Sequence, residues 1–170
     1  VDRTKNVSGV IRALAVARGK MPSLQLTIIG DGPDRKALET LANEKGLGQV
    51  VKFLGRLPNS GVLDHMAGAG AVIINSNVET FSVVTGEALA QGKPVIATRC
   101  GGPVAFITPE NGILIEPKDD EALAQAMLQL ASEAQRYSPD RIRDSVSARF
   151  SPMAVGSAFL DLYHRTLAQH

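Results

Sequence analysis

The sequence predicts an α/β domain in three layers, with a Rossmann-like parallel sheet and helices on both of its faces. Short aliphatic runs alternate along the chain with longer segments of helical periodicity, the order that a parallel sheet with crossover helices requires. The aliphatic runs lack alternating polar residues, so we expect strands that are buried on both faces. A chain of 170 residues that is 44% hydrophobic and 21% charged has the size and composition of one globular domain.

In the first half of the chain, glycines separate most of the expected elements. Helical spacing of apolar residues predicts helices, and short runs of β-branched and aliphatic residues predict strands. In order, we expect a helix at 7–18, a strand at 24–29, a helix at 34–45, a strand at 50–54, a helix at 59–68 and a strand at 71–74.

The second half of the chain has clearer helix boundaries. Gly92 is the expected C-terminal stop of one helix, because glycine readily adopts the left-handed conformation that ends helices. Asp119, followed by two further acids, suits the start of another by capping and by its charge. In order, we expect a helix at 83–91, strands at 94–97 and 112–115, and helices at 119–133, 139–149 and 152–169. The last helix either covers the sheet with its apolar side or leaves part of that side exposed.

Composition argues against several classes of protein. A net charge of +1 lacks the basic excess of a dedicated nucleic-acid binder. The single cysteine, Cys100, excludes an internal disulfide framework and favours a reducing, cytoplasmic setting, with Cys100 as a small packing residue. The three histidines have no metal-ligand spacing, so no metal site is predicted. No apolar run approaches the roughly 20 residues of a membrane-spanning helix.

Ligands of such sheets bind beyond the carboxyl ends of the strands, here in the four loops that follow Ile29, Leu54, Ile74 and Ala97. The last of these loops contains the glycine pair Gly101-Gly102, which permits close approach to the backbone. Gly30 and Gly32 allow a sharp turn and close approach of a ligand to the backbone. They also resemble part of a dinucleotide fingerprint, but Arg35 occupies the position of the third glycine. Arg56, after the next strand, is either a surface charge or, in an NADP site, a phosphate ligand. A plain strand-to-helix turn is the alternative for the first loop.

The loop and helix at 75–89 contain two glutamates eight positions apart, Glu79 in the loop and Glu87 about one turn into the helix. Between them lie backbone N–H groups without helical partners, which together with the helix dipole suit a diphosphate. A carboxylate accepts hydrogen bonds from two neighbouring hydroxyls, so one glutamate could hold a ribose and the other a sugar. Acids that simply stabilise a helix start are the alternative.

These residues carry a family resemblance. The stretch Glu79-Thr80-Phe81-Ser82-Val83-Val84-Thr85-Gly86-Glu87, with Gly92-Lys93-Pro94-Val95 and Gly101-Gly102 in order, resembles the signature of the group 1, glycogen-synthase-like glycosyltransferases of the GT-B type. The similarity extends over almost the whole chain. Further matching segments are Lys5-Asn6, the strand and turn from Leu26 to Pro33, Phe53-Leu54-Gly55 and Asn111-Gly112-Ile113-Leu114.

The resemblance implies a role for each matching position. Glu79 would contact the hydroxyls of the donor sugar, Glu87 the ribose, and Lys5 the diphosphate as its leaving charge develops. The backbone around Arg56 would meet the nucleobase. The sugar and diphosphate would be held at the helix start by the backbone of Phe81, Ser82, Val83 and Val84. The implied reaction is transfer of a sugar from a nucleotide-diphosphate sugar with retention, with neither metal nor additional cofactor.

Several departures from the family pattern limit this assignment. The sequence starts at Val1 and lacks the strand and the Gly-Arg pair that usually precede the lysine segment. We therefore expect a gap in the sheet between the strands at 24–29 and 71–74. Gly70 and Asn75 replace a usual Asp and Pro. The resemblance covers only the donor-binding, C-terminal half of a two-domain enzyme, so we expect the chain without its acceptor domain to bind a nucleotide sugar weakly and to transfer nothing.

Besides the nucleotide sugar, this interpretation predicts two partners. The expected partners are the missing N-terminal acceptor domain, against which part of the last helix would pack, and an acceptor that could lie at a membrane surface.

Three other functions are alternatives to this interpretation. A non-catalytic nucleotide-binding or interaction module is one alternative. An NAD(P)-dependent oxidoreductase half is another, although its glycine fingerprint is broken. A GT-B epimerase or phosphorylase is the nearest one.

Overall fold

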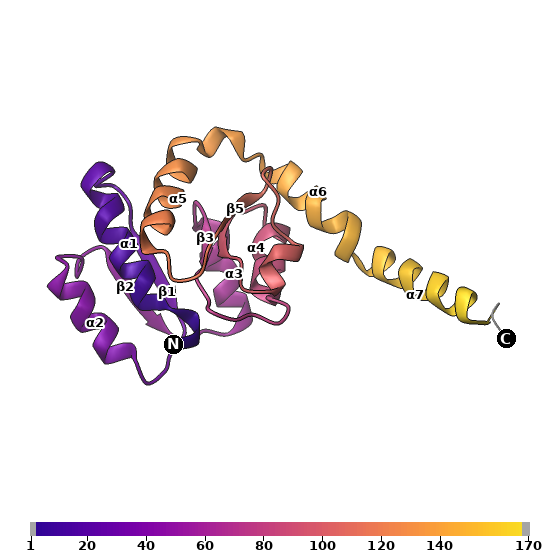
Figure 1. Ribbon diagram of the computed structural model, residues 1–170, viewed down its shortest axis with the longest axis horizontal. Helices are drawn as coiled ribbons and strands as arrows, with labels where there is room; N and C mark the ends of the chain where they lie inside the picture. Colours follow the sequence, from indigo (N-terminus) through magenta and orange to yellow (C-terminus); the bar gives the residue numbers. More distant parts are fainter. Residues whose placement is uncertain (1–2, 168–170) are drawn as a thin grey trace.

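The computed structural model describes residues 3–167, which form two parallel sheets with helices on both sides (Figure 1). Every helix and strand expected from the sequence is present, with bounds that differ by no more than a few residues within the described range. Short 3₁₀ turns at Arg3–Lys5, Gly102–Ala105 and Ala134–Arg136 were not expected. The strands are β1 (Leu26–Ile29), β2 (Val51–Gly55), β3 (Val72–Ile74), β4 (Val95–Thr98) and β5 (Gly112–Ile115). The helices are α1 (Val7–Lys20), α2 (Arg35–Glu44), α3 (Asn59–Gly68), α4 (Val83–Ala90), α5 (Asp120–Ser132), α6 (Pro139–Phe150) and α7 (Pro152–Leu167).

The strands do not form one continuous sheet. Strand β1 pairs in parallel with β2, and β4 pairs in parallel with β3 and β5, but among the described residues β1 and β3 do not pair. This confirms the gap expected between the strands at 24–29 and 71–74. The N-terminal segment lies against the chain that follows β3, because the amide of Asn77 donates to the carbonyl of Thr4 at 2.7 Å.

The helices form two groups that enclose an aliphatic core. Helix α1 contacts α5 and α2, whereas α4 contacts α3 and α6. Strand β4 is buried along its whole length, as expected for a strand between two neighbours and two helix layers. Burial of each large aliphatic side chain stabilises the fold by about 1.5–3 kcal/mol. The largest aliphatic side chains with almost no exposed surface are Ile11, Leu89, Ile96, Leu123, Ile142 and Val95.

Two helix boundaries follow the sequence signals closely. The side chain of Asp119 accepts a hydrogen bond from the amide of Ala122 at 2.8 Å and so caps α5. Gly92 ends α4 with a φ of 71°, and its amide donates to the carbonyl of Leu89 at 2.8 Å.

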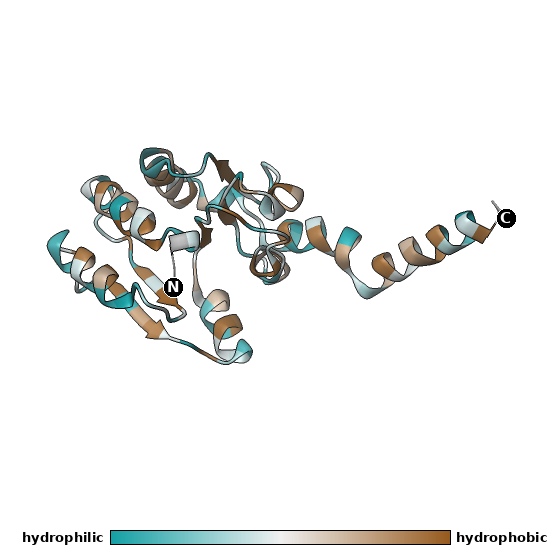
Figure 2. Ribbon diagram, turned by 60° about the horizontal axis from the view of Figure 1, so that its bottom comes forward, coloured by the Kyte–Doolittle hydropathy of each residue, from teal (hydrophilic) through white to brown (hydrophobic). Residues whose placement is uncertain are grey.

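Helix α7 does not cover the sheet, so that interpretation was wrong, whereas the alternative of an exposed apolar side is confirmed. Figures 1 and 2 show α7 extending away from the rest of the molecule, and its principal packing partner is α6. Ser151 has extended backbone angles that separate α6 from α7, while α6 already packs against α4. The apolar side of α7 is therefore exposed. It consists of Met153, Val155, Phe159, Leu160, Leu162, Tyr163 and Leu167.

No helix within residues 3–167 combines the length and the apolar character that crossing a membrane requires.

Candidate functional site

The loop after β3 leads into α4 through a residue in the left-handed conformation. Ser82 has a φ of 65°, and α4 begins at the next residue, Val83. The Ser82 hydroxyl lies 2.8 Å from the hydroxyl of Thr85 and does not cap the helix. The amide of Thr85 already donates to the carbonyl of Ser82 at 2.9 Å. The amides of Val83 and Val84 precede the first bond of the helix, so their position suits an anion. The side chains of Val83 and Val84 are exposed at this end of the helix.

The carboxylate of Glu79 is the most constrained charged group of this loop. Lys5 donates a hydrogen bond to Oε1 of Glu79 and forms an ion pair with it. The hydroxyl of Ser76 donates to the same oxygen at 2.8 Å. Lys5, the residue predicted to bind the diphosphate, and Glu79, the residue predicted to bind the sugar, are thus in direct contact.

These contacts shift the titration of Glu79. Burial by itself raises the pKa of the Glu79 carboxyl, whose side chain is 15% exposed. The hydrogen bonds from Lys5 and Ser76 and the positive charge of Lys5 outweigh this effect and hold the pKa below its ordinary value of 4.5. Glu79 is therefore ionised at neutral pH and acts as a hydrogen-bond acceptor.

The backbone of Glu79 is fixed by the loop after β4. Its amide donates to the carbonyl of Cys100 at 3.0 Å, and its carbonyl accepts from the amide of Gly102 at 2.7 Å. Gly101 has a φ of 115°, and a Cβ on Gly101 or Gly102 would collide with the backbone of Glu79 or Phe81. The close approach expected of this glycine pair is therefore made by the chain's own backbone.

Phe81 connects the loop to the helices below it. Its ring packs edge-on against Phe106 at 5.2 Å between centroids and lies 6.3 Å from Phe150, the last residue of α6. Phe106 stacks on Phe150 at 4.7 Å and lies under Gly86, where a Cβ would be 3.4 Å from its ring. Sequence reasoning missed Phe106 and Phe150, since no local pattern shows which aromatic residues meet across separate elements.

Glu87 lies on α4, one turn after the helix start, as expected, and its side chain is partly buried. The described contacts do not join it to Glu79. Its proximity to the first amides of α4 follows from its position in the first two turns of the same helix.

Gly30, Gly32 and Arg56 lie at the carboxyl ends of β1 and β2. The amide of Gly30 donates to the carbonyl of Gly55 at 2.7 Å, which joins the two loops. Gly30 and Gly55 both have a positive φ. Arg56 is exposed just beyond β2. These residues belong to the two-stranded sheet, whereas Glu79 follows a strand of the three-stranded sheet.

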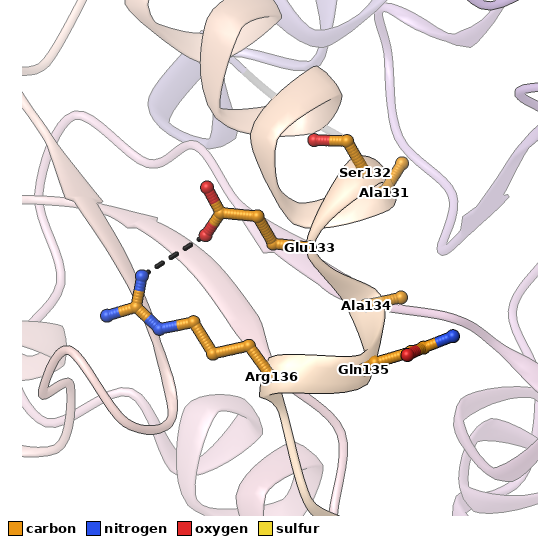
Figure 3. A pocket seen from close by; sticks show the side chains of 6 residues that line it. All are labelled: Ala131, Ser132, Glu133, Ala134, Gln135 and Arg136. Atoms are coloured by element: carbon orange, nitrogen blue, oxygen red, sulfur yellow. Dashed lines mark hydrogen bonds and ion pairs between the residues drawn. The ribbon is translucent and has the colours of Figure 1, made fainter.

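A surface hollow of about 610 Å³ lies elsewhere, at the end of α5. Figure 3 shows the ion pair between Glu133 and Arg136, 3.1 Å long, in this hollow, which is lined by residues 131–136. None of the predicted site residues lines it. Within residues 3–167, no three or more His, Cys, Asp or Glu side chains cluster so as to hold a metal ion. That transfer proceeds without a metal stays a prediction.

Comparison with known proteins connects this arrangement to a family. The sequence model described as "Glycosyl transferases group 1" matches residues 1–144. The chain is 33% identical over 171 residues to the lipopolysaccharide core biosynthesis glycosyltransferase LpsD of Rhizobium meliloti, covering 98% of this chain and 48% of LpsD. It thus spans about half the length of this relative.

Solved structures agree with the sequence comparison. HepE of Anabaena, crystallised in complex with UDP, superposes with a TM-score of 0.86 at 25% identity, over 96% of this chain and 46% of HepE. The C-terminal domain of the group 1 protein LpcC of Francisella tularensis superposes with a TM-score of 0.80 at 27% identity, over 89% of this chain and 83% of that domain. These likenesses favour a glycosyltransferase over the oxidoreductase alternative. Because the family model matches residues 1–144 of the chain's 170, the chain belongs to the group 1 family of glycosyltransferases.

Proposed function

We propose that this chain is the donor-binding, C-terminal domain of a two-domain GT-B glycosyltransferase, which transfers a sugar from a nucleotide-diphosphate donor with retention. The observation that supports this proposal most strongly is the ionised Glu79 carboxylate, held beside Lys5 at the loop that opens α4. An acceptor of hydroxyl groups from this loop, a cation from the N-terminal segment and the N-terminus of α4 meet there.

The donor is expected to extend from this loop along α4. Its diphosphate would accept hydrogen bonds from the backbone between Phe81 and Val84, with Lys5 neutralising its charge. Glu79 would accept hydrogen bonds from the sugar hydroxyls, and Glu87 from the ribose. The base would lie near the backbone of Arg56. The turn at Gly30 and Gly32 would border the same donor.

The ion pair between Lys5 and Glu79 would couple binding of the diphosphate to binding of the sugar. A diphosphate competes with Glu79 for the Lys5 ammonium group because both are anions. When Lys5 turns to the phosphates, the Glu79 oxygens become available to sugar hydroxyls. During transfer, the bond between the anomeric carbon and the phosphate oxygen breaks, a bond from that carbon to the acceptor hydroxyl oxygen forms on the same face of the sugar, and the hydroxyl proton is released. The charge left on the nucleoside diphosphate is stabilised by Lys5 and the α4 amides.

The acceptor would be held by a second domain, since the chain spans only 48% of LpsD. That domain would also exclude water from the transferred sugar. We therefore expect residues 1–170 alone to bind a donor weakly and to transfer no sugar. A cytoplasmic location, with the acceptor at a membrane surface, is part of this proposal for the full-length enzyme.

Calorimetric titration tests the proposal. The folded chain is titrated with UDP-glucose, GDP-mannose and ADP-glucose, and with the corresponding nucleoside diphosphates. Saturable heat with at least one donor is expected, together with no sugar release or transfer by the chain alone. A folded sample that binds none of them would contradict the donor site and favour a non-catalytic interaction module.

A further inference from the structure

The Glu79 carboxylate is reached by two donors of different mobility. Lys5 has a long side chain that is 52% exposed, whereas Ser76 has a short side chain and is only 1% exposed. Both donate to Oε1 of Glu79. Among the described contacts, the second carboxylate oxygen receives neither of these bonds, so it can accept one from a ligand hydroxyl.

A hydrogen bond from β4, the middle strand of the three-stranded sheet, fixes the backbone of Ser76. The hydroxyl of Thr98, the last residue of β4, donates to the carbonyl of Ser76 at 2.5 Å. Thr98 has no exposed surface, and β4 is buried throughout. Two hydrogen bonds therefore connect the buried strand β4 with the Glu79 carboxylate, one accepted by the Ser76 backbone carbonyl and one donated by the Ser76 hydroxyl.

The two donors to Glu79 respond differently to an anionic ligand. An incoming diphosphate attracts the exposed ammonium group of Lys5, and the flexible side chain can follow it. The Ser76 hydroxyl is buried and neutral, and its short side chain cannot follow. Once Lys5 has turned to phosphate, Ser76 is the remaining described hydrogen bond that orients the carboxylate.

We propose that Ser76 is a positioning residue for recognition of the donor sugar: it holds the Glu79 carboxylate in its sugar-accepting orientation when Lys5 moves to the diphosphate. This inference rests on the proposed donor site. Ser76 acts only through Glu79, so its hydroxyl should affect the sugar part of donor binding and leave the nucleoside diphosphate part unchanged.

The Ser76→Ala variant tests this division. The donor is the one among UDP-glucose, GDP-mannose and ADP-glucose that the unmodified chain binds best, and calorimetry gives its Kd and that of its nucleoside diphosphate. In Ser76→Ala, we expect the ratio of the nucleotide-sugar Kd to the nucleoside-diphosphate Kd to rise about tenfold, the value of one hydrogen bond to a charged group. The Kd of the nucleoside diphosphate itself should be unchanged.

Ser145→Ala is the matched control. Its hydroxyl is also partly buried and donates to the carbonyl of Ile142 at 2.6 Å, while it accepts from Asn111 at 2.9 Å. Asn111 precedes β5, so this network lies at the opposite ends of the strands from Glu79. Ser145→Ala should lower stability without changing the ratio.

Each outcome separates the two hypotheses. If the unmodified chain binds no donor, the proposed function is wrong. If it binds a donor but Ser76→Ala weakens both ligands equally, or neither, the positioning role is wrong and the donor site stands. Should Ser76→Ala fail to fold, Thr98→Val, which removes the bond to the Ser76 carbonyl, decides by the same ratio. A rise of about threefold supports the role, and an unchanged ratio overturns it.

Discussion

Lys5 and Glu79, which lie 74 positions apart in the sequence, form an ion pair at the loop that opens α4. The pair brings together the residue that the family resemblance assigns to the donor sugar and the residue that it assigns to the diphosphate. It also connects the N-terminal segment before α1 with the loop after β3. A ligand that binds either residue must therefore disturb the other.

Removal of Lys5 should change both stability and its pH dependence. In the unmodified chain the pKa of Glu79 lies below its unfolded value, so its ionisation stabilises the fold above a pH of about 4.5, and this contribution is lost as the pH falls through the lower, folded pKa. Lys5→Ala removes two of the causes that lower this pKa. The difference in unfolding free energy between the two proteins should therefore shrink on acidification, as measured by urea unfolding from pH 7 to pH 3. A constant difference would show that the ion pair does not control Glu79.

Glu87→Ala should weaken binding of the nucleoside diphosphate, because the proposed site loses the acceptor for the ribose hydroxyls. One hydrogen bond to a charged group corresponds to an affinity loss of about tenfold or more. Glu133→Ala is the control, since it removes a surface carboxylate that pairs with Arg136 far from the strand ends. Equal effects of the two substitutions in calorimetry would refute the ribose role.

Gly102→Ala should displace the loop that contains Glu79. The new Cβ would collide with the backbone of Phe81, two residues after Glu79, whose carbonyl accepts a hydrogen bond from the Gly102 amide. Relief of this collision should strain that hydrogen bond. Donor binding should be lost, and the thermal midpoint should fall. Gly19→Ala in α1 is the control, because a Cβ there meets no atom within 4 Å and alanine favours a helix by up to about 1 kcal/mol. Normal donor binding by Gly102→Ala would show that the glycine pair does not fix the loop.

Phe106→Ala should reduce stability by about 3–5 kcal/mol, the usual cost of removing a buried phenylalanine. Phe106 is 3% exposed and supports both Phe81 and Gly86, so donor binding should weaken as well. Phe159→Ala on the exposed face of α7 should change stability by less than about 0.5 kcal/mol. Chemical denaturation of both variants compares them, and similar losses would mean that α7 packs as tightly as the core.

Much of the fold was predictable from local patterns. The helices and strands were expected at nearly their observed bounds, because periodicity, Asp119 as a cap and Gly92 as a stop are signals that a few neighbouring residues carry. The gap between β1 and β3 was also predictable, but only by resemblance to a family whose strand order was known. The position of α7 was not predictable, because an apolar helical face does not specify what it packs against.

The candidate site was likewise predictable only in part from the sequence. The sequence by itself determined which residues belong to the loop and to α4, since the two glutamates, the helix start and the glycine pair are local features of one chain segment and its motif. Only the tertiary structure decided that Gly101 and Gly102 support the Glu79 backbone, that Phe106 and Phe150 support Phe81, and that Ser76 and Lys5 share one carboxylate oxygen. These contacts join residues from different strands and helices. Their distances depend on how the elements pack together, which no local pattern encodes.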